Sequence, residues 1–261
     1  MRRNELNNVL TARRPLWKQV ACLVGLGLLG VLSLLLQPVS EQLLSQYPEF
    51  ADMPVWGLKL LVMLNPLVLL IVAAWLGALV AHRVGLRSLV AGTAWSIDTH
   101  RAWLQAAVAG LLTGAVLVCL DVLAAPWLGE TWQRYLWQAS RPNAHSLLIG
   151  VLYGGVTEEI LMRWGLMSVL AWAMWRLVGR KHNGLAIVFA IFAVALVFGM
   201  AHLPVLAAQL ELSTGIVTRT VLLNALAGLV YGWVFWRHHL EAAMLSHACS
   251  HLAMGMVWAL V

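Results

Sequence analysis

Glu158, Glu159 and Arg163 lie close together in a stretch of sequence that is otherwise apolar enough to cross a membrane. A charged side chain at the centre of a bilayer costs about 2.5–3.5 kcal/mol on insertion scales. Three such groups are retained together only where they are paired, lie in a wet cavity or carry out chemistry. The stretch Thr157-Glu158-Glu159-Ile-Leu-Met-Arg163 is therefore the first candidate for a functional site.

Helical spacing predicts different roles for the two glutamates. On a helix, Glu159 and Arg163 are four residues apart and face each other in the favourable order, so we expect an ion pair that lowers the cost of burying both. Glu158 is turned about 100° from Glu159, which leaves it without a partner on its own helix. An unpaired carboxylate in this setting could act as a general base. The alternative is a purely structural ion cluster.

Three histidines add polar groups to later apolar segments. Phe198 and His202 are four residues apart near the end of one segment. His247 and His251 share one face of the last segment, at a spacing that suits a metal site. Taken singly, each motif is explained equally well by a histidine that forms an ordinary interhelical hydrogen bond. Together with the glutamates, the three histidines indicate one shared site.

Gly154-Gly155, just before the glutamates, predicts an irregular helix. We expect these glycines to loosen or break it, and a break would let Thr157 cap a half-helix with both glutamates in its first turn. A break would also resolve a conflict in depth. At about 1.5 Å per residue, Glu158 lies roughly 27 Å from Arg176 at the end of its segment, and His202 lies roughly 27 Å from Gly184 at the start of its own. His247 lies only about 10 Å from the start of its segment. The alternative to a broken helix is that the expected topology of the second half is wrong.

The composition places these motifs in a membrane protein. Of the 261 residues, 61% are hydrophobic and 11% are charged, which is too apolar for a soluble globular domain. The formal net charge of +6 comes mostly from short loops, where positive charge sets topology, so it does not indicate nucleic-acid binding. The three cysteines lie in apolar segments, and no disulfide framework is expected.

The apolar segments predict an all-α, polytopic transmembrane helical bundle with about seven spans, plus or minus one, in a single membrane domain over residues 1–261. The approximate spans are 20–39, 55–80, 103–124, 145–176, 184–203, 215–236 and 240–261. We expect residues 84–100 to lie at the interface, residues 125–144 to form a loop, and Asp121 to be interfacial and outside the site.

The distribution of Lys and Arg orients the bundle. The polar and basic tail of residues 1–19 is predicted to be cytoplasmic, in a multi-pass protein of the cell membrane. Three Gly-x-x-x-Gly pairs, at 110 and 114, 150 and 154, and 228 and 232, are typical of helices whose backbones approach closely.

The three motifs, in this order and spacing, resemble the CAAX protease and bacteriocin-processing family (CPBP, or Abi). These are intramembrane endopeptidases related to the eukaryotic Ras-converting CAAX protease. The resemblance rests on Glu158-Glu159-Ile-Leu-Met-Arg163, Phe198-Gly-Met-Ala-His202 and His247-Ala-Cys-Ser-His251. It covers about residues 145–255, which would form the catalytic core.

The resemblance implies a role for each motif residue. Glu158 would activate the attacking water with help from His202, and Glu159 with Arg163 would hold the site together. The two histidines of the last motif would stabilise the oxyanion or bind a metal. The family motif usually ends in Asn, whereas this chain has His251, which can still donate a hydrogen bond.

Two mechanisms and two other functions stay open from the sequence. Glu158, His202, His247 and His251 could together bind Zn²⁺, or they could activate water without a metal. The substrate would be a peptide or protein at the membrane, in contact with the lipid bilayer. A proton-coupled transporter would be expected to have two pseudo-symmetric halves, whereas the strong polar motifs here all lie in the second half. A membrane scaffold without protease activity is the other alternative.

Overall fold

The computed structural model describes residues 14–38, 48–50, 52–92, 99–139, 143–180 and 182–260. These residues are helical apart from their turns and contain no strand, as predicted for an all-α bundle. Residues 1–13 of the expected cytoplasmic tail and residues 93–98 of the expected interfacial segment lie outside the described part.

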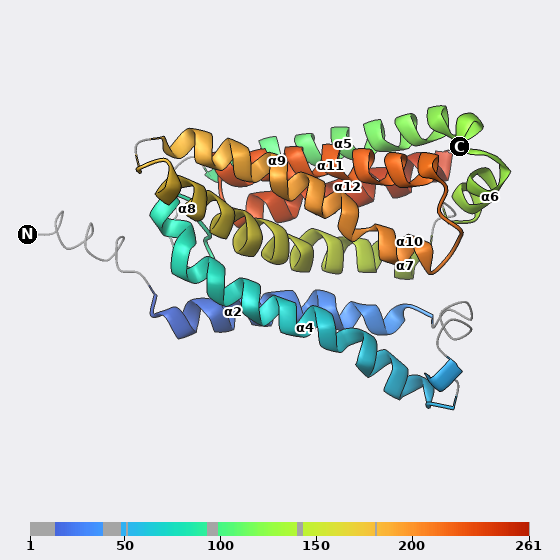
Figure 1. Ribbon diagram of the computed structural model, residues 1–261, viewed down its shortest axis with the longest axis horizontal. Coiled ribbons are helices and arrows are strands. Elements are labelled where there is room, and N and C mark those ends of the chain that lie inside the picture. The colour runs from blue at the N-terminus through green and yellow to red at the C-terminus, as the bar shows by residue number, and fades with distance from the viewer. Residues whose placement is uncertain are drawn as a thin grey trace, which may run out of the picture.

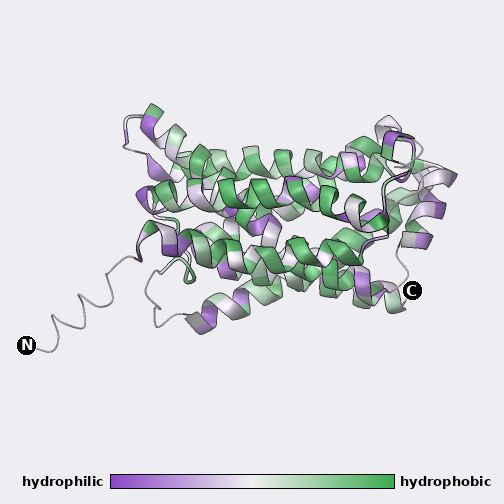
Figure 2. Cartoon of the chain, turned by 90° about the horizontal axis from the view of Figure 1, so that it is seen from below, coloured by the Kyte–Doolittle hydropathy of each residue, from purple (hydrophilic) through white to green (hydrophobic). Residues whose placement is uncertain are grey.

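The long helices run side by side along one axis of the molecule (Figure 1). Hydrophilic residues gather mainly at the two ends of the bundle, and apolar residues cover its sides (Figure 2). The helical elements in chain order are α2 (Leu16–Ser33), η1 (Leu34–Leu36), η2 (Pro48–Phe50), α4 (Val55–Val80), η3 (Ala81–Val84), α5 (Thr99–Leu128), α6 (Glu130–Ala139), α7 (Ala144–Ile149), η4 (Gly150–Glu158), η5 (Ile160–Met167), α8 (Ser168–Leu177), α9 (Asn183–Ala201), α10 (Leu203–Ala207), α11 (Thr214–Arg237) and α12 (Leu240–Leu260).

Five helices of the described residues are long and apolar enough to cross a membrane. They are Leu16–Leu36, Val55–Val84, His100–Leu128, Asn183–Ala207 and Thr214–Arg237. The two expected spans outside this set are the ones that carry the Glu pair and the last His pair. Residues 144–177 are divided into four successive helical elements, and the polar side chains of α12 reduce its hydropathy.

The helix that carries the two glutamates is widened and not broken. Over η4 and η5 the backbone follows π-helical geometry, with hydrogen bonds from residue i to i+5. Helical dihedral angles continue through Glu159 between them. Such geometry is rare and is often found at functional sites. The expected capping role of Thr157 is therefore wrong. Its buried hydroxyl instead donates to the Gly27 carbonyl of α2 at 2.7 Å.

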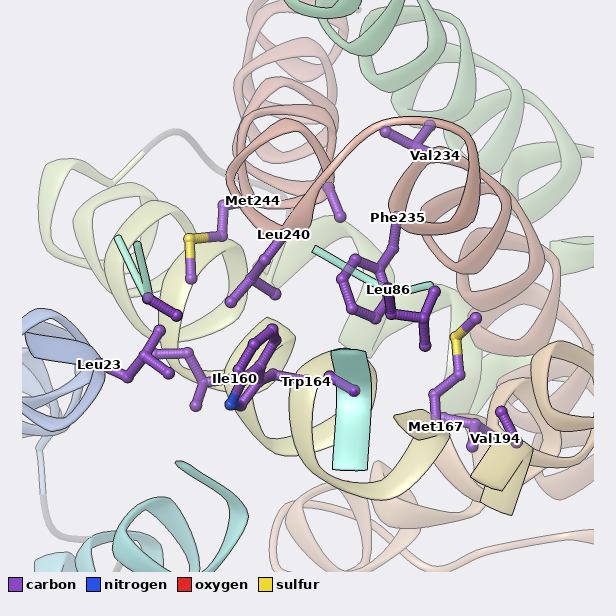
Figure 3. Packing of buried hydrophobic residues seen from close by; sticks show 14 of the residues in the cluster. Leu23, Leu86, Ile160, Trp164, Met167, Val194, Val234, Phe235, Leu240 and Met244 are labelled. Carbon is purple, nitrogen blue, oxygen red and sulfur yellow. The ribbon is translucent and has the colours of Figure 1, made fainter. Parts of the chain in front are cut away.

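The turn between α11 and α12 is buried, which resolves the conflict in depth. Leu86, Phe235 and Leu240 belong to one buried cluster (Figure 3). The Glu241 carboxylate accepts hydrogen bonds from the Ser88 hydroxyl at 2.6 Å and from the backbone N–H groups of the two residues after Ser88. Because residues 85–92 pack beneath the turn, α12 begins inside the bundle, and His247 reaches the depth of the glutamates without a broken helix.

Two features at the other end of the bundle differ from the sequence expectations. Asp121 is buried and not interfacial, because Arg219 of α11 donates to it through Nε at 2.8 Å and also through Nη2. The Arg219 guanidinium lies 4.4 Å from the centre of the Trp132 ring. Trp132 belongs to α6, a helix that occupies part of the expected 125–144 loop.

The predicted close approaches of glycines occur at helix contacts. Gly110 and Gly114 of α5 lie against the backbone carbonyls of Ser246 and Ser250 in α12, and no room is left for a Cβ. The pair at 228 and 232 in α11 packs less tightly against α9, where a Cβ would lie 3.0 Å from Ala195 and 3.2 Å from Ile191. Small residues thus allow the α12 backbone to lie directly on α5.

We predict that Gly110→Ala lowers the stability of the protein by about 1–3 kcal/mol, because the new methyl group overlaps a backbone carbonyl that cannot rotate away. Thermal unfolding in detergent would measure this. Gly25→Ala in α2 is the matched control, since nothing lies within 4 Å of a Cβ at that position and alanine favours the helix. Equal melting temperatures for Gly110→Ala and the wild type would contradict the packing.

Candidate active site

Glu159 is the centre of a buried polar network. Its side chain is fully buried, and the Arg163 side chain is 1% exposed. Glu159 Oε1 lies 3.1 Å from Arg163 Nη1 and 2.8 Å from His247 Nδ1. The expected pair is therefore present, and His247 joins it from a helix 88 residues further along the chain. A carboxylate only accepts hydrogen bonds, so Nδ1 of His247 donates and Nε2 is the free ring nitrogen.

The Arg163 guanidinium is enclosed by aromatic rings and backbone. Its Nη2 donates to the Gly228 carbonyl at 3.3 Å. Its Cζ lies 4.7 Å from the centre of the Phe198 ring and 5.2 Å from that of Tyr231. A buried cation is tolerated when it is paired and its remaining donors and faces have partners. This arrangement links η5 to α9 and α11 around one charge.

The His247 ring is fixed on both of its faces. Tyr231 stacks on it with 4.3 Å between centroids, and His251 stacks with 5.0 Å between centroids. The Tyr231 hydroxyl hydrogen-bonds to Ser250, whose hydroxyl donates to the His247 carbonyl at 2.7 Å. Sequence reasoning missed Tyr231 and Ser250, because they stand at the unspecified positions of the Gly-x-x-x-Gly and His-x-x-x-His motifs and their contact joins two different helices.

His202 and Glu158 lie beside this network and are half-buried. His202 Nδ1 lies 2.7 Å from the Phe198 carbonyl, to which it donates, so its Nε2 stays available. The Phe198 ring contacts both His202 and His247, with 4.7 Å and 5.7 Å between ring centroids. Among the described residues, Glu158 forms no ion pair or hydrogen bond. The structure thus brings the expected site residues together and leaves Glu158 as the uncommitted carboxylate.

Two glycines make the space for the last His pair. A Cβ at Gly154 would lie 2.7 Å from His251 Nε2 and 3.4 Å from His247 Nε2. A Cβ at Gly150 would lie 2.7 Å from His251 Nδ1. The Nε2 edges of both rings therefore face the η4 backbone at Gly154, which has no side chain and lies one turn before Glu158.

The arrangement does not fit a zinc site built from Glu158, His202, His247 and His251. In the described part of the chain, no group of three or more His, Cys, Asp or Glu side chains lies close enough to hold a metal ion. The rings of His247 and His251 are within 16° of parallel. A ring nitrogen binds a metal in the plane of its ring, so stacked rings do not aim at one point.

We predict that Arg163→Leu destabilises the protein by about 3–5 kcal/mol, because it leaves the buried Glu159 carboxylate without its cation. Thermal unfolding in detergent is again the measurement. Adding Glu159→Leu to the same chain should recover part of the loss, since no unpaired charge is then buried. If the single variant is as stable as the wild type, Glu159 is not the charged centre of this network.

The motif-bearing half of the chain also matches a known family. Residues 140–253 match the family model described as Type II CAAX prenyl endopeptidase Rce1-like. No curated protein and no solved structure matches the chain. The matched region contains the Glu pair, Arg163 and all three histidines of the site. Residues 140–253 are therefore similar to the Rce1-like family of CAAX endopeptidases, as the three motifs indicated.

Proposed function

We propose that this protein is an intramembrane endopeptidase that hydrolyses a peptide bond in a peptide or membrane-associated protein. The observation that carries the proposal is that the two adjacent carboxylates differ in their contacts. Glu159 is committed to Arg163 and His247, whereas Glu158 is half-buried and has no partner among the described residues. The family of residues 140–253 supports protease activity of the CAAX type.

In the proposed reaction, Glu158 accepts a proton from a water molecule as the water oxygen attacks the peptide carbonyl carbon. His202 assists through Nε2, since its Nδ1 is bound to the Phe198 carbonyl. The carbonyl oxygen then gains negative charge, which a positioned N–H donor stabilises. When the C–N bond breaks, the proton held by Glu158 passes to the leaving amine.

His251 supplies the hydrogen-bond donor that faces the developing charge, whereas His247 presents an acceptor nitrogen. His251 occupies the position at which the family usually has Asn, and either side chain can donate a hydrogen bond to an oxyanion. Glu159 accepts the Nδ1 hydrogen of His247 and so presents Nε2 of that ring to the site. This is the role of a carboxylate that orients a catalytic imidazole.

The basic end of the bundle gives the proposed orientation. The chain is a multi-pass membrane protein, and we infer that its N-terminus lies in the cytoplasm. The basis is that α2 begins at the end of the bundle that carries Arg83, Arg87, Arg101, Arg176 and Arg237 (Figure 1).

We predict that Glu158→Gln lowers the rate of peptide cleavage by about 10²–10⁴-fold, the range typical of a general base. The purified protein in proteoliposomes would be assayed by mass spectrometry with C-terminal peptides, both prenylated and unprenylated. Glu130→Gln on the exposed side of α6 is the matched control and should cleave at the wild-type rate. Normal cleavage by Glu158→Gln would exclude the proposed base. If the wild type itself cleaves none of the peptides and releases none in cells, a scaffold or transporter is favoured.

His251 provides a second test of the assignment. We expect His251→Asn to retain most of the activity, because the amide supplies the same kind of hydrogen-bond donor, and His251→Leu to lose about 10²–10³-fold, the usual cost of removing an oxyanion donor. The catalytic constants of the two variants are compared under saturating peptide. Equal activity of His251→Leu and the wild type would remove His251 from the reaction.

A further inference from the structure

Three arginines and two tryptophans gather where α8 ends. Arg83 of η3 and Arg176 of α8 lie over the same indole, with their Cζ atoms 6.0 Å and 5.7 Å from the Trp172 ring centre. Arg180, in the turn after α8, lies 5.7 Å from the ring centre of Trp175. We call these five residues the arginine–tryptophan cluster. It is separate from the Glu and His network and has no part in the proposed reaction.

The guanidinium groups of the cluster have no anionic partner in the described part of the chain. The three side chains are exposed, and no acidic residue occurs in η3, in α8 or in residues 178–180. Glu241, which contacts the segment that follows η3, already accepts hydrogen bonds from Ser88 and the backbone of residues 89 and 90. The cluster therefore presents three uncompensated positive charges.

The backbone after α8 is shaped to hold Arg180 in place. Arg180 is the single non-glycine residue with positive φ, 64°, among the described residues. That conformation is unfavourable for residues with a Cβ. The Trp175 indole N–H donates to the Arg180 carbonyl at 3.1 Å, while the guanidinium lies over the same indole. These two contacts hold Arg180 against Trp175.

A buried donor in the cluster also lacks a partner. The indole Nε1 of Trp172, the ring shared by Arg83 and Arg176, is buried and has no hydrogen-bond acceptor among the described residues. Buried donors of this kind are usually satisfied by water or by a ligand. The cluster thus combines charge without a counter-charge and a donor without an acceptor.

We propose that the arginine–tryptophan cluster binds the phosphate of an anionic phospholipid. Guanidinium groups bind phosphate through paired N–H donors. Tryptophan at a helix end marks the level of the lipid headgroups, and anionic headgroups attract basic groups at that level. The bound phosphate would lie between η3 and α8 and hold the end of α4 against the helix that continues from Arg163.

The test compares two triple variants of equal charge. The first, Arg83→Gln/Arg176→Gln/Arg180→Gln, removes the cluster. The second, Arg87→Gln/Arg101→Gln/Arg237→Gln, removes three exposed arginines outside it that lie towards the same end of the bundle. Each protein is placed in nanodiscs of equal phosphatidylglycerol and phosphatidylcholine, and the lipids retained on release are counted by native mass spectrometry. Circular dichroism and size-exclusion chromatography confirm that each variant is folded.

We expect the cluster variant to retain about 100-fold less phosphatidylglycerol than the wild type, given about fivefold for each of its three basic groups near an anionic surface, and the control variant to retain the wild-type amount. Equal losses in both variants would show attraction by overall charge and overturn the site. Unchanged retention in both would overturn it as well. Displacement of the lipid by inorganic phosphate at millimolar concentration would assign the cluster to a soluble anion instead.

If the cluster variant fails to fold, Trp172→Leu and Trp175→Leu provide a second test, because they keep all three charges. Each should reduce the retention of phosphatidylglycerol by a smaller factor and leave phosphatidylcholine unchanged. Full retention by both would overturn the proposal. None of these measurements depends on peptide cleavage, so the lipid-site proposal and the protease proposal are tested independently.

Discussion

The buried contact of Glu159 with Arg163 and His247 is the constraint on which the motif-bearing part of the bundle depends. A carboxylate that is 0% exposed is tolerated only because a guanidinium lies 3.1 Å away and an imidazole 2.8 Å away. The arginine in turn needs Phe198, Tyr231 and the Gly228 carbonyl. One charge thereby fixes the relative positions of η5, α9, α11 and α12.

Close backbone packing makes this convergence possible. Gly110 and Gly114 let α12 lie directly on α5, and Gly150 and Gly154 leave the space that the His251 ring fills. The π-helical geometry of η4 and η5 changes the direction of side chains along the helix without breaking it. As a result, Glu158 lies beside the histidines while Glu159 points into the ion network. Two glutamates that are adjacent in the sequence thus lie in two different environments.

The two ends of the molecule use charge in different ways. At the α6 end, Asp121 and Arg219 neutralise each other beneath Trp132. At the α8 end, the arginines lie on indoles and face no acid in the described residues. The Asp121–Arg219 pair is neutralised within the protein. The arginines of the cluster keep a positive charge that can attract an anionic group in the membrane.

The sequence by itself determined the apolar helical class and the Glu159–Arg163 pair, because span length and four-residue spacing are local properties. It also identified the histidines, since polar groups inside apolar runs are conspicuous. Only the tertiary structure decided that His247 is the third partner, that Tyr231 stacks on it, and that Asp121 is paired with Arg219. Those contacts join segments far apart in the chain, and helices that are apolar all round carry no periodic signal of depth or facing neighbour.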